Sequence, residues 1–245
     1  VMPPMCMFSS DESGTVKPFH KLHYPTRALG GVGLIIVEAT AVAPNGRISS
    51  QDLGLWQDSQ IEGLREVVDS VHQFGGHIAI QLAHAGRKCT SSDPEIVAPS
   101  ALAFNAESRT PRALEISEMP GIAEAFQAAA RRANQAGFDA VEIHAAHGYL
   151  LHEFLSPLTN QRTDAYGGST ENRTRLLREV LTAVRAVWPA DKALFLRISA
   201  SDHAEGGINL DESLKIVDQV KDLVDLVHVS TGGLIETPFK LYPGY

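Results

Sequence analysis

Five short apolar segments recur along the chain, each followed by a polar stretch and then by apolar residues at helical spacing. The segments are compact and rich in β-branched residues, which favours strands buried on both faces and therefore parallel. They cover residues 33–38, 77–82, 139–144, 193–198 and 225–230. A sixth strand is predicted around residues 2–7, at the start of the chain.

Four helices are predicted between these strands. In the first, Ile61, Leu64, Val68 and Val71 repeat at helical spacing, and Ser59 to Glu62 has the sequence of a capping box. Apolar repeats over residues 126–133, 176–184 and 214–224 indicate the other three. Their ends are expected near Gly137, before Pro189, and at an N-cap formed by Asn209 or Asp211.

The unbroken alternation of strands and helices predicts one α/β domain. A wound sheet and a (β/α)8 barrel both satisfy the alternation, and two observations favour the barrel. Residues 30–33 are Gly-rich but precede a strand, so they do not form the phosphate loop of a dinucleotide fold. Polar side chains gather at the predicted strand ends, where barrel enzymes build their active sites. They are Glu38, Gln81, His144, Arg197, His228 and Ser230.

The pattern accounts for six strands, whereas a barrel needs eight. Residues 241–245 have the composition of a loop. We therefore predict an α/β fold of the (β/α)8 TIM-barrel type, with residues 1–245 in one domain. Strands 7 and 8 are expected to be absent at the C-terminus, and a few residues are expected to be absent before Val1.

Composition narrows the classes of partner. The net charge of -8 and the low pI near 5.7 argue against a nucleic-acid binder, which shows a basic stripe. No apolar run approaches the ~20 residues of a membrane span. Cys6 and Cys89 are too few for a disulfide scaffold and fit a reducing compartment. We expect a cytoplasmic protein with neither nucleic acid nor membrane as partner.

The densest chemistry lies in the segment that contains His144, His147 and Tyr149, directly after a predicted strand. Three interpretations are open. With Glu142, the histidines could bind zinc, although a third ligand and the His-Glu-x-x-His spacing are lacking. Alternatively, they are loop histidines with satisfied hydrogen bonds. In the third interpretation, two imidazole donors face one oxygen, and Tyr149 delivers a proton.

Gln81 and Arg197 suit the neighbourhood of a flat, electron-accepting ring. An amide offers both a donor and an acceptor to the edge of a heterocycle, and a guanidinium stabilises an anionic ring. A hydrogen bond to backbone and a structural ion pair are the respective alternatives. The sulfur-rich segment 3–8 suits packing against an aromatic ring, or it fills the core.

Several motifs, taken in order, resemble the Old Yellow Enzyme family of FMN-dependent ene-reductases, especially its bacterial branch with a cysteine beside the flavin. The motifs occupy residues 4–7, 36–40, 81–88, 144–150, 154–157, 160–172 and 197–199. The resemblance implies that the flavin is lined by Pro4, Met5, Cys6, Ala39, Gln81 and Arg197. It also makes Cys6 a thiol that tunes the flavin and touches substrate. Phe8 replaces a substrate-contacting tyrosine that this branch often carries.

The resemblance further implies an NADPH dehydrogenase or ene-reductase with no catalytic metal. NADPH or NADH reduces FMN, and a hydride passes to the β-carbon of an enone, enal or nitroalkene. His144 and His147 hold the activating oxygen, and Tyr149 protonates the α-carbon. A homo-dimer or homo-tetramer is implied as well. Two alternatives remain: a metal-dependent hydrolase that uses His144, His147 and Glu142, and an incomplete barrel unable to hold FMN.

Overall fold

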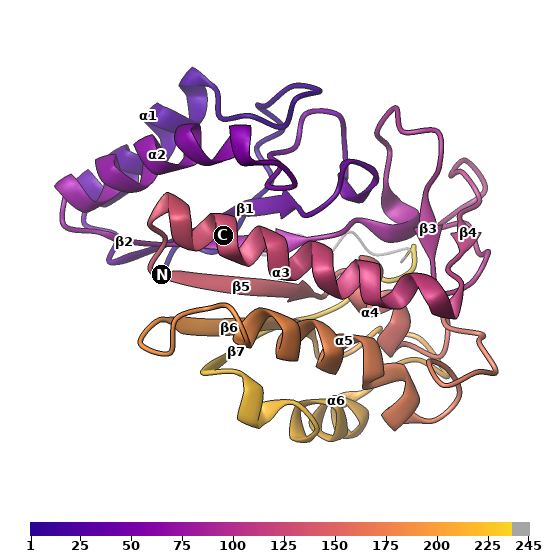
Figure 1. Ribbon diagram of the computed structural model, residues 1–245. Helices are drawn as coiled ribbons and strands as arrows, with labels where there is room; N and C mark the ends of the chain where they lie inside the picture. The colour runs from indigo at the N-terminus through magenta and orange to yellow at the C-terminus, as the bar shows by residue number, and fades with distance from the viewer. Residues whose placement is uncertain (237–245) are drawn as a thin grey trace.

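A five-stranded parallel sheet forms the centre of the computed structural model, which describes residues 1–236 (Figure 1). The strand order is β1-β2-β5-β6-β7, and every adjacent pair is parallel, so the predicted α/β alternation is confirmed. The five strands are β1 (Leu34–Ala41), β2 (His77–Ala83), β5 (Ala140–Ala145), β6 (Ala193–Ser199) and β7 (Leu226–Ser230). A separate short pair consists of β3 (Val97–Ala98) and β4 (Arg112–Ala113).

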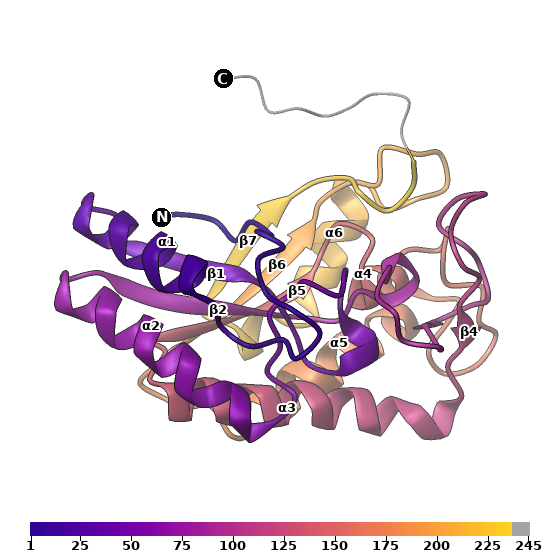
Figure 2. The same ribbon diagram turned by 90° about the horizontal axis from the view of Figure 1, so that it is seen from above.

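The helices α2, α3 and α5 lie along one face of the sheet in both views (Figures 1 and 2). The helices pack against one another in the order α1, α2, α3, α5 and α6. Together they form the outer layer of an open segment of a barrel. The helices are α1 (Pro18–Leu29), α2 (Ile61–Gln73), α3 (Met119–Ala136), α4 (Leu150–Leu155), α5 (Thr170–Arg185) and α6 (Leu210–Asp218). No helix of the described residues is long and apolar enough to cross a membrane.

Two helix ends agree with the sequence prediction. Gly137 terminates α3 in the left-handed conformation with φ 95°, where glycine carries no Cβ penalty. Asn209 is the N-cap of α6, and its side chain accepts a hydrogen bond from the Glu212 N–H.

Other helix predictions are wrong in their details. Ser59 lies inside a 3₁₀ turn that precedes α2, so it forms no capping box with Glu62. Instead, the side chain of Gln60 accepts from the backbone N–H of Gln57. Helix α6 stops at Asp218, before the end of the apolar repeat. Helices α1 and α4 were not predicted.

The expected first strand is reduced to a single bridge at Met2. The Met2 N–H donates to Leu34, and the Met2 carbonyl accepts from Ile36. Pro3 and Pro4 follow, and neither has a backbone N–H to continue a ladder. The segment therefore reaches the edge of β1 as an irregular chain.

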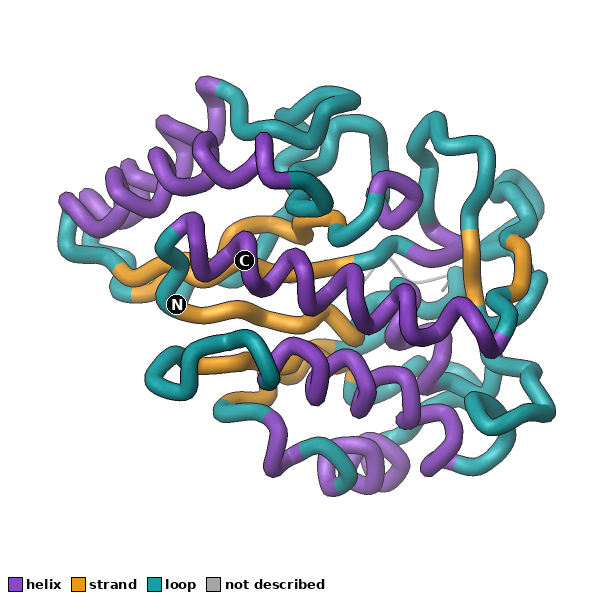
Figure 3. The backbone as a smooth tube through the Cα atoms, viewed as in Figure 1, coloured by secondary structure: helices purple, strands orange, loops and turns teal. Residues whose placement is uncertain are grey.

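The inner face of the sheet changes character along the strands. Near the start of the strands it is apolar, with Ile36, Ala79, Ala140 and Phe195 packed together. Two residues further along, the same face carries Glu38, Gln81, Glu142 and Arg197. Most of the loops gather at the end of the sheet to which the strands run (Figure 3). This end holds the polar side chains that the sequence singled out.

Candidate active site

The turn after β5 places three of the predicted site residues together. Two of its residues take left-handed backbone conformations, His147 with φ 60° and Gly148 with φ 76°. A Cβ on Gly148 would lie 2.4 Å from the carbonyl oxygen of Gly233, so only glycine fits against the segment after β7. The Gly148 N–H donates to His152 Nδ1 at 2.9 Å. The turn is thus fixed from both sides.

The two imidazoles converge at the mouth of this turn. His144 Nε2 lies 3.4 Å from His147 Nδ1, and the rings are nearly perpendicular with centroids 5.1 Å apart. Burial, followed by the neighbouring His147 and Arg197, holds the pKa of His144 well below its ordinary value. Burial and Arg197 lower the pKa of His147 to about 3. Both imidazoles are therefore neutral at pH 7 and present N–H groups without a buried charge.

Tyr149 completes this cluster. Its ring meets the ring of His144 edge-on at 5.0 Å, and the Lys88 ammonium lies 5.1 Å from its centroid. Burial raises the pKa of the Tyr149 phenol above its ordinary value, so the hydroxyl keeps its proton at neutral pH. The ammonium of Lys88 donates to the carbonyl oxygens of His147 and Gly233, each at 3.0 Å.

Gln81 and Arg197 lie on the same inner face of the sheet as His144, and Glu142 connects the polar layer. Gln81 Nε2 donates to Glu142 Oε1 at 2.7 Å, and His228 Nδ1 lies 2.8 Å from Glu142 Oε2. Both carboxylate oxygens are thus engaged away from the histidine pair. Among residues 1–236 no group of three or more His, Cys, Asp or Glu side chains is arranged to hold a metal ion.

Arg197 has a buried hydrogen-bond donor that a ligand could satisfy. It pairs in register with His144 and with His228, and its buried Nε has no hydrogen-bond partner among the described residues. A buried donor without an acceptor is costly, and the electron-rich edge of an isoalloxazine ring would satisfy it. The amide of Gln81 adds a donor and an acceptor on the same face. The residues present therefore fit the ring of FMN.

The N-terminal segment is only partly gathered at this site. Pro4 and Ala39 are buried, Cys6 is half-buried, and Met5 is 48% exposed. Burial, then Asp52 and Glu38, raises the pKa of the Cys6 thiol to about 12.

Phe8 is an exposed residue of the same N-terminal segment. It is 45% exposed, with φ 49°, and has no ring contact with the histidines in the described part of the chain. The role of Phe8 as a substrate-binding residue therefore stays a prediction.

Sequence reasoning assigned no role to several residues that hold the site. Ser199 Oγ accepts from the His147 N–H at 3.0 Å, and Ser230 Oγ lies 2.6 Å from His147 Nε2. The Glu38 carboxylate accepts hydrogen bonds from the Met7 N–H and from the hydroxyl of Tyr24. Tyr24 belongs to α1, a helix that the sequence did not predict. Their common signal is a polar side chain inside or at the end of an apolar strand.

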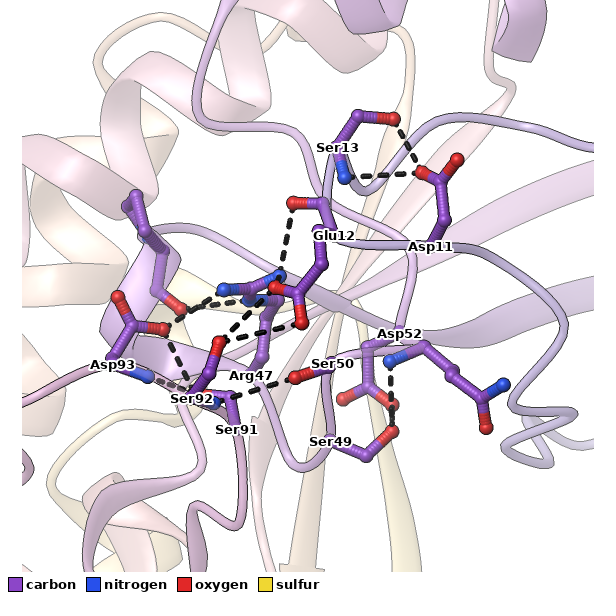
Figure 4. Close-up of polar contacts among 12 residues, drawn as sticks. Asp11, Glu12, Ser13, Arg47, Ser49, Ser50, Asp52, Ser91, Ser92 and Asp93 are labelled. Carbon is purple, nitrogen blue, oxygen red and sulfur yellow. Dashed lines mark hydrogen bonds and ion pairs between the residues drawn. The ribbon is translucent and has the colours of Figure 1, made fainter.

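Loops at the carboxyl end of the sheet are joined by Arg47 (Figure 4). Its guanidinium donates to the carbonyl of Glu12 at 3.0 Å and to the carboxylate of Asp93 at 2.9 Å. Ser92 adds hydrogen bonds to the Glu12 carboxylate. Segments from three different loops are thus held as one unit beside the site.

Comparison with known proteins identifies the fold and the family. The model of the "NADH:flavin oxidoreductase / NADH oxidase family" matches residues 1–240. The chain belongs to this family. It is 57% identical to an NADPH dehydrogenase of Clostridium acetobutylicum over its whole length, which is 73% of that protein. An NADPH dehydrogenase of Bacillus subtilis is 51% identical, and 72% of it is covered.

Solved structures agree with this family assignment. Morphinone reductase superposes with a TM-score of 0.82 at 35% identity, over 93% of this chain and 66% of that one. An Old Yellow Enzyme homologue from Zymomonas mobilis gives 0.81 at 31% identity, over 93% of this chain and 68% of the other. The predicted barrel-type fold and the predicted resemblance are confirmed.

Family membership also decides between the classes of function. The protein is an FMN-dependent oxidoreductase of the Old Yellow Enzyme type, with NADPH as reductant, as predicted. The metal-dependent hydrolase is superseded by this assignment. The engaged carboxylate of Glu142 gives a physical reason, since it faces Gln81 and His228 and leaves the histidine pair without an acidic partner.

Proposed function

We propose that this oxidoreductase is an ene-reductase acting on enones, enals and nitroalkenes. One observation carries the proposal: two neutral imidazole nitrogens lie 3.4 Å apart at the mouth of the site, beside a protonated phenol. Two donors that meet at one point suit a carbonyl or nitro oxygen that gains negative charge during the reaction. Pre-positioned neutral donors stabilise that charge more as it grows.

The isoalloxazine ring of FMN would bind to residues on the inner face of the sheet. Gln81 and Arg197 would hold the polar edge of the isoalloxazine, with Ala39, Pro4, Met5 and Cys6 along its flank. FMN bound there would supply hydride transfer from NADPH to the β-carbon of the alkene. Arg197 brings a fixed positive charge to the site, where negative charge accumulates on the ring and substrate.

Tyr149 supplies the proton in this proposal. Its raised pKa makes it a weak acid, but the α-carbon of an enolate is far more basic than a phenolate, so the transfer is downhill. The Lys88 ammonium over its ring stabilises the phenolate that remains. The tyrosine regains its proton from solvent.

The remaining expectations belong to the same proposal. Residues 1–245 would form part of one barrel domain, in a cytoplasmic homo-dimer or homo-tetramer. Phe8 would border the substrate entrance without a hydroxyl contact.

Replacement of Tyr149 by Phe tests the proton-donor role in the full-length holoprotein. Stopped-flow measurements should show flavin reduction by NADPH within about twofold of wild type. Alkene reduction should slow by about 10² to 10⁴, the usual contribution of a general acid. Tyr166→Phe is the matched control, because its hydroxyl bonds Glu179 away from the site, and both half-reactions should be unchanged. Equal losses in both half-reactions of Tyr149→Phe would contradict the role.

A further inference from the structure

The hydroxyl of Ser230 lies 2.6 Å from the Nε2 atom of His147, at the end of β7. We propose that Ser230 is a positioning residue that allows His147 to carry its proton on Nδ1, where the substrate oxygen is received. The inference rests on the proposed function, since it concerns the two imidazoles, His144 and His147, that would hold the substrate oxygen. We call this pair the oxygen clamp. None of the sequence motifs that carry the family resemblance includes Ser230.

His144 has only one arrangement of its proton. The backbone N–H of Ala146 donates to His144 Nδ1 at 3.2 Å, so this nitrogen is an acceptor. A neutral imidazole has one N–H, and the proton of His144 is therefore on Nε2. This N–H faces the point where the two rings converge.

His147 has two possible arrangements, and only one serves the clamp. With the proton on Nε2, the Nδ1 lone pair receives the His144 N–H, and a bound oxygen would meet a single donor. With the proton on Nδ1, both imidazoles present an N–H to the oxygen. The Nε2 atom is then an acceptor and needs a donor of its own, because a buried unpaired acceptor is costly.

Ser230 can satisfy either arrangement, because a hydroxyl rotates between donor and acceptor. Without a ligand, the hydrogen bonds run from His144 to His147 to Ser230. When an oxygen binds, Ser230 donates to Nε2, and the chain of bonds reverses. A proton leaves Nε2 and one is gained at Nδ1 through water, so the ring stays neutral and no hydrogen bond is lost.

The ring of His147 is held for this exchange by its backbone. Its N–H donates to Ser199 Oγ, and its carbonyl accepts from Lys88 Nζ. Ser199 Oγ in turn donates to the carbonyl of Gly232 at 2.9 Å. The partner on Nε2 therefore changes which nitrogen carries the proton, while the ring stays in place.

The test uses Ser230→Ala and Ser230→Thr in the full-length holoprotein, with para-hydroxybenzaldehyde as the oxygen-bearing probe. Imidazole ¹⁵N spectra of the complex report the protonated nitrogen directly. Wild type and Ser230→Thr should show His147 protonated on Nδ1. Ser230→Ala leaves the Nε2 acceptor of the complex without a donor and should bind the probe about tenfold more weakly, the loss expected for one neutral hydrogen bond.

Two controls separate this role from a general defect. Thr231→Val removes a neighbouring hydroxyl, which bonds Ser201 and His203, and should leave probe affinity unchanged. In a His147→Ala background, Ser230→Ala should have no further effect on affinity. Nδ1 protonation in Ser230→Ala with wild-type affinity would overturn the inference, as would a Thr variant no better than Ala. Failure of wild type to bind the probe at all would instead count against the proposed function.

Discussion

Cys6 combines a half-buried side chain with two nearby carboxylates. Burial disfavours the thiolate, and the negative charges of Asp52 and Glu38 disfavour it further. The thiol is consequently protonated throughout the physiological range. Its influence on a bound ring would come from its polarisable sulfur and its S–H group.

This protonation state predicts slow alkylation of Cys6. With a pKa of about 12, the thiolate fraction at pH 8 is on the order of 10⁻⁴, whereas an ordinary cysteine is about one quarter thiolate. Mass spectrometry should show iodoacetamide labelling of Cys6 at least about a hundredfold slower in the native protein than in urea. Labelling should rise with pH through pH 10 without a plateau. A labelling rate that levels off between about pH 9 and pH 10 would show an unshifted thiol.

At the scale of elements, the turn after β5 depends on the short helix α4. His152 on α4 accepts the Gly148 N–H at Nδ1, and its Nε2 lies 2.9 Å from the carboxylate of Asp202. Asp202 also accepts from Ser156 Oγ and from the Ile208 N–H. A fully buried acid thus lies against the ring that accepts the hydrogen bond from the turn.

Two substitutions of His152 separate its hydrogen bond with Gly148 from its contact with Asp202. His152→Asn keeps an acceptor where Nδ1 lies and loses the contact with Asp202. His152→Gln keeps a donor near Asp202 and loses the acceptor for Gly148. Both should lower the free energy of unfolding in urea, by about 1–3 kcal/mol. His152→Gln should weaken phenol binding more than His152→Asn; the opposite order would show that Asp202, and not the Gly148 bond, is what the turn requires.

The elements were predictable where local chemistry and packing agree. The amphipathic repeats of α2, α3 and α5, and the glycine that ends α3, were visible in the sequence. Helix α1 was not, because it begins after Lys17, which is a poor N-cap, and contains Pro25 in its interior. Its stability comes from buried Tyr24 and His20, which contact Glu38 on the neighbouring strand β1, and no local pattern reveals this contact.

The site was predictable in part for the same reason. His144, His147, Tyr149, Gln81 and Arg197 follow strands that end at one edge of the sheet, so their meeting could be expected. The partners that fix them come from distant segments, as Ser230 does for His147. Phe8 illustrates the limit, since it lies in an irregular segment with no strand or helix pattern that would predict its burial.

At the scale of the whole molecule, one apolar layer lies directly beneath the polar site. Phe195 fills the space beside the small side chains of Ala79 and Ala140, and Ile36 closes the layer. The large ring and the small side chains complement each other in volume, as close packing requires. This layer supports Gln81, Glu142 and Arg197, which are two residues further along the same strands.

Truncation of Phe195 tests this support. Phe195→Ala should lower the free energy of unfolding by about 3–5 kcal/mol, and Phe195→Leu by less than about 2 kcal/mol. Urea denaturation of the full-length holoprotein measures both. Phe74→Ala is the control, because Phe74 is 48% exposed and should cost less than about 1 kcal/mol. Equal costs at the two positions would show that the inner layer is not closely packed.

The ammonium of Lys88 bonds the carbonyl of His147 on one loop and the carbonyl of Gly233 on another. The two loops are therefore linked through one side chain. The free energy of ordering one loop is coupled to the free energy of ordering the other. A ligand that holds the histidines must stabilise the segment after β7 by the same free energy with which that segment improves ligand binding. The affinity of such a ligand would thus also measure how completely residues 231–236 are docked against the turn after β5.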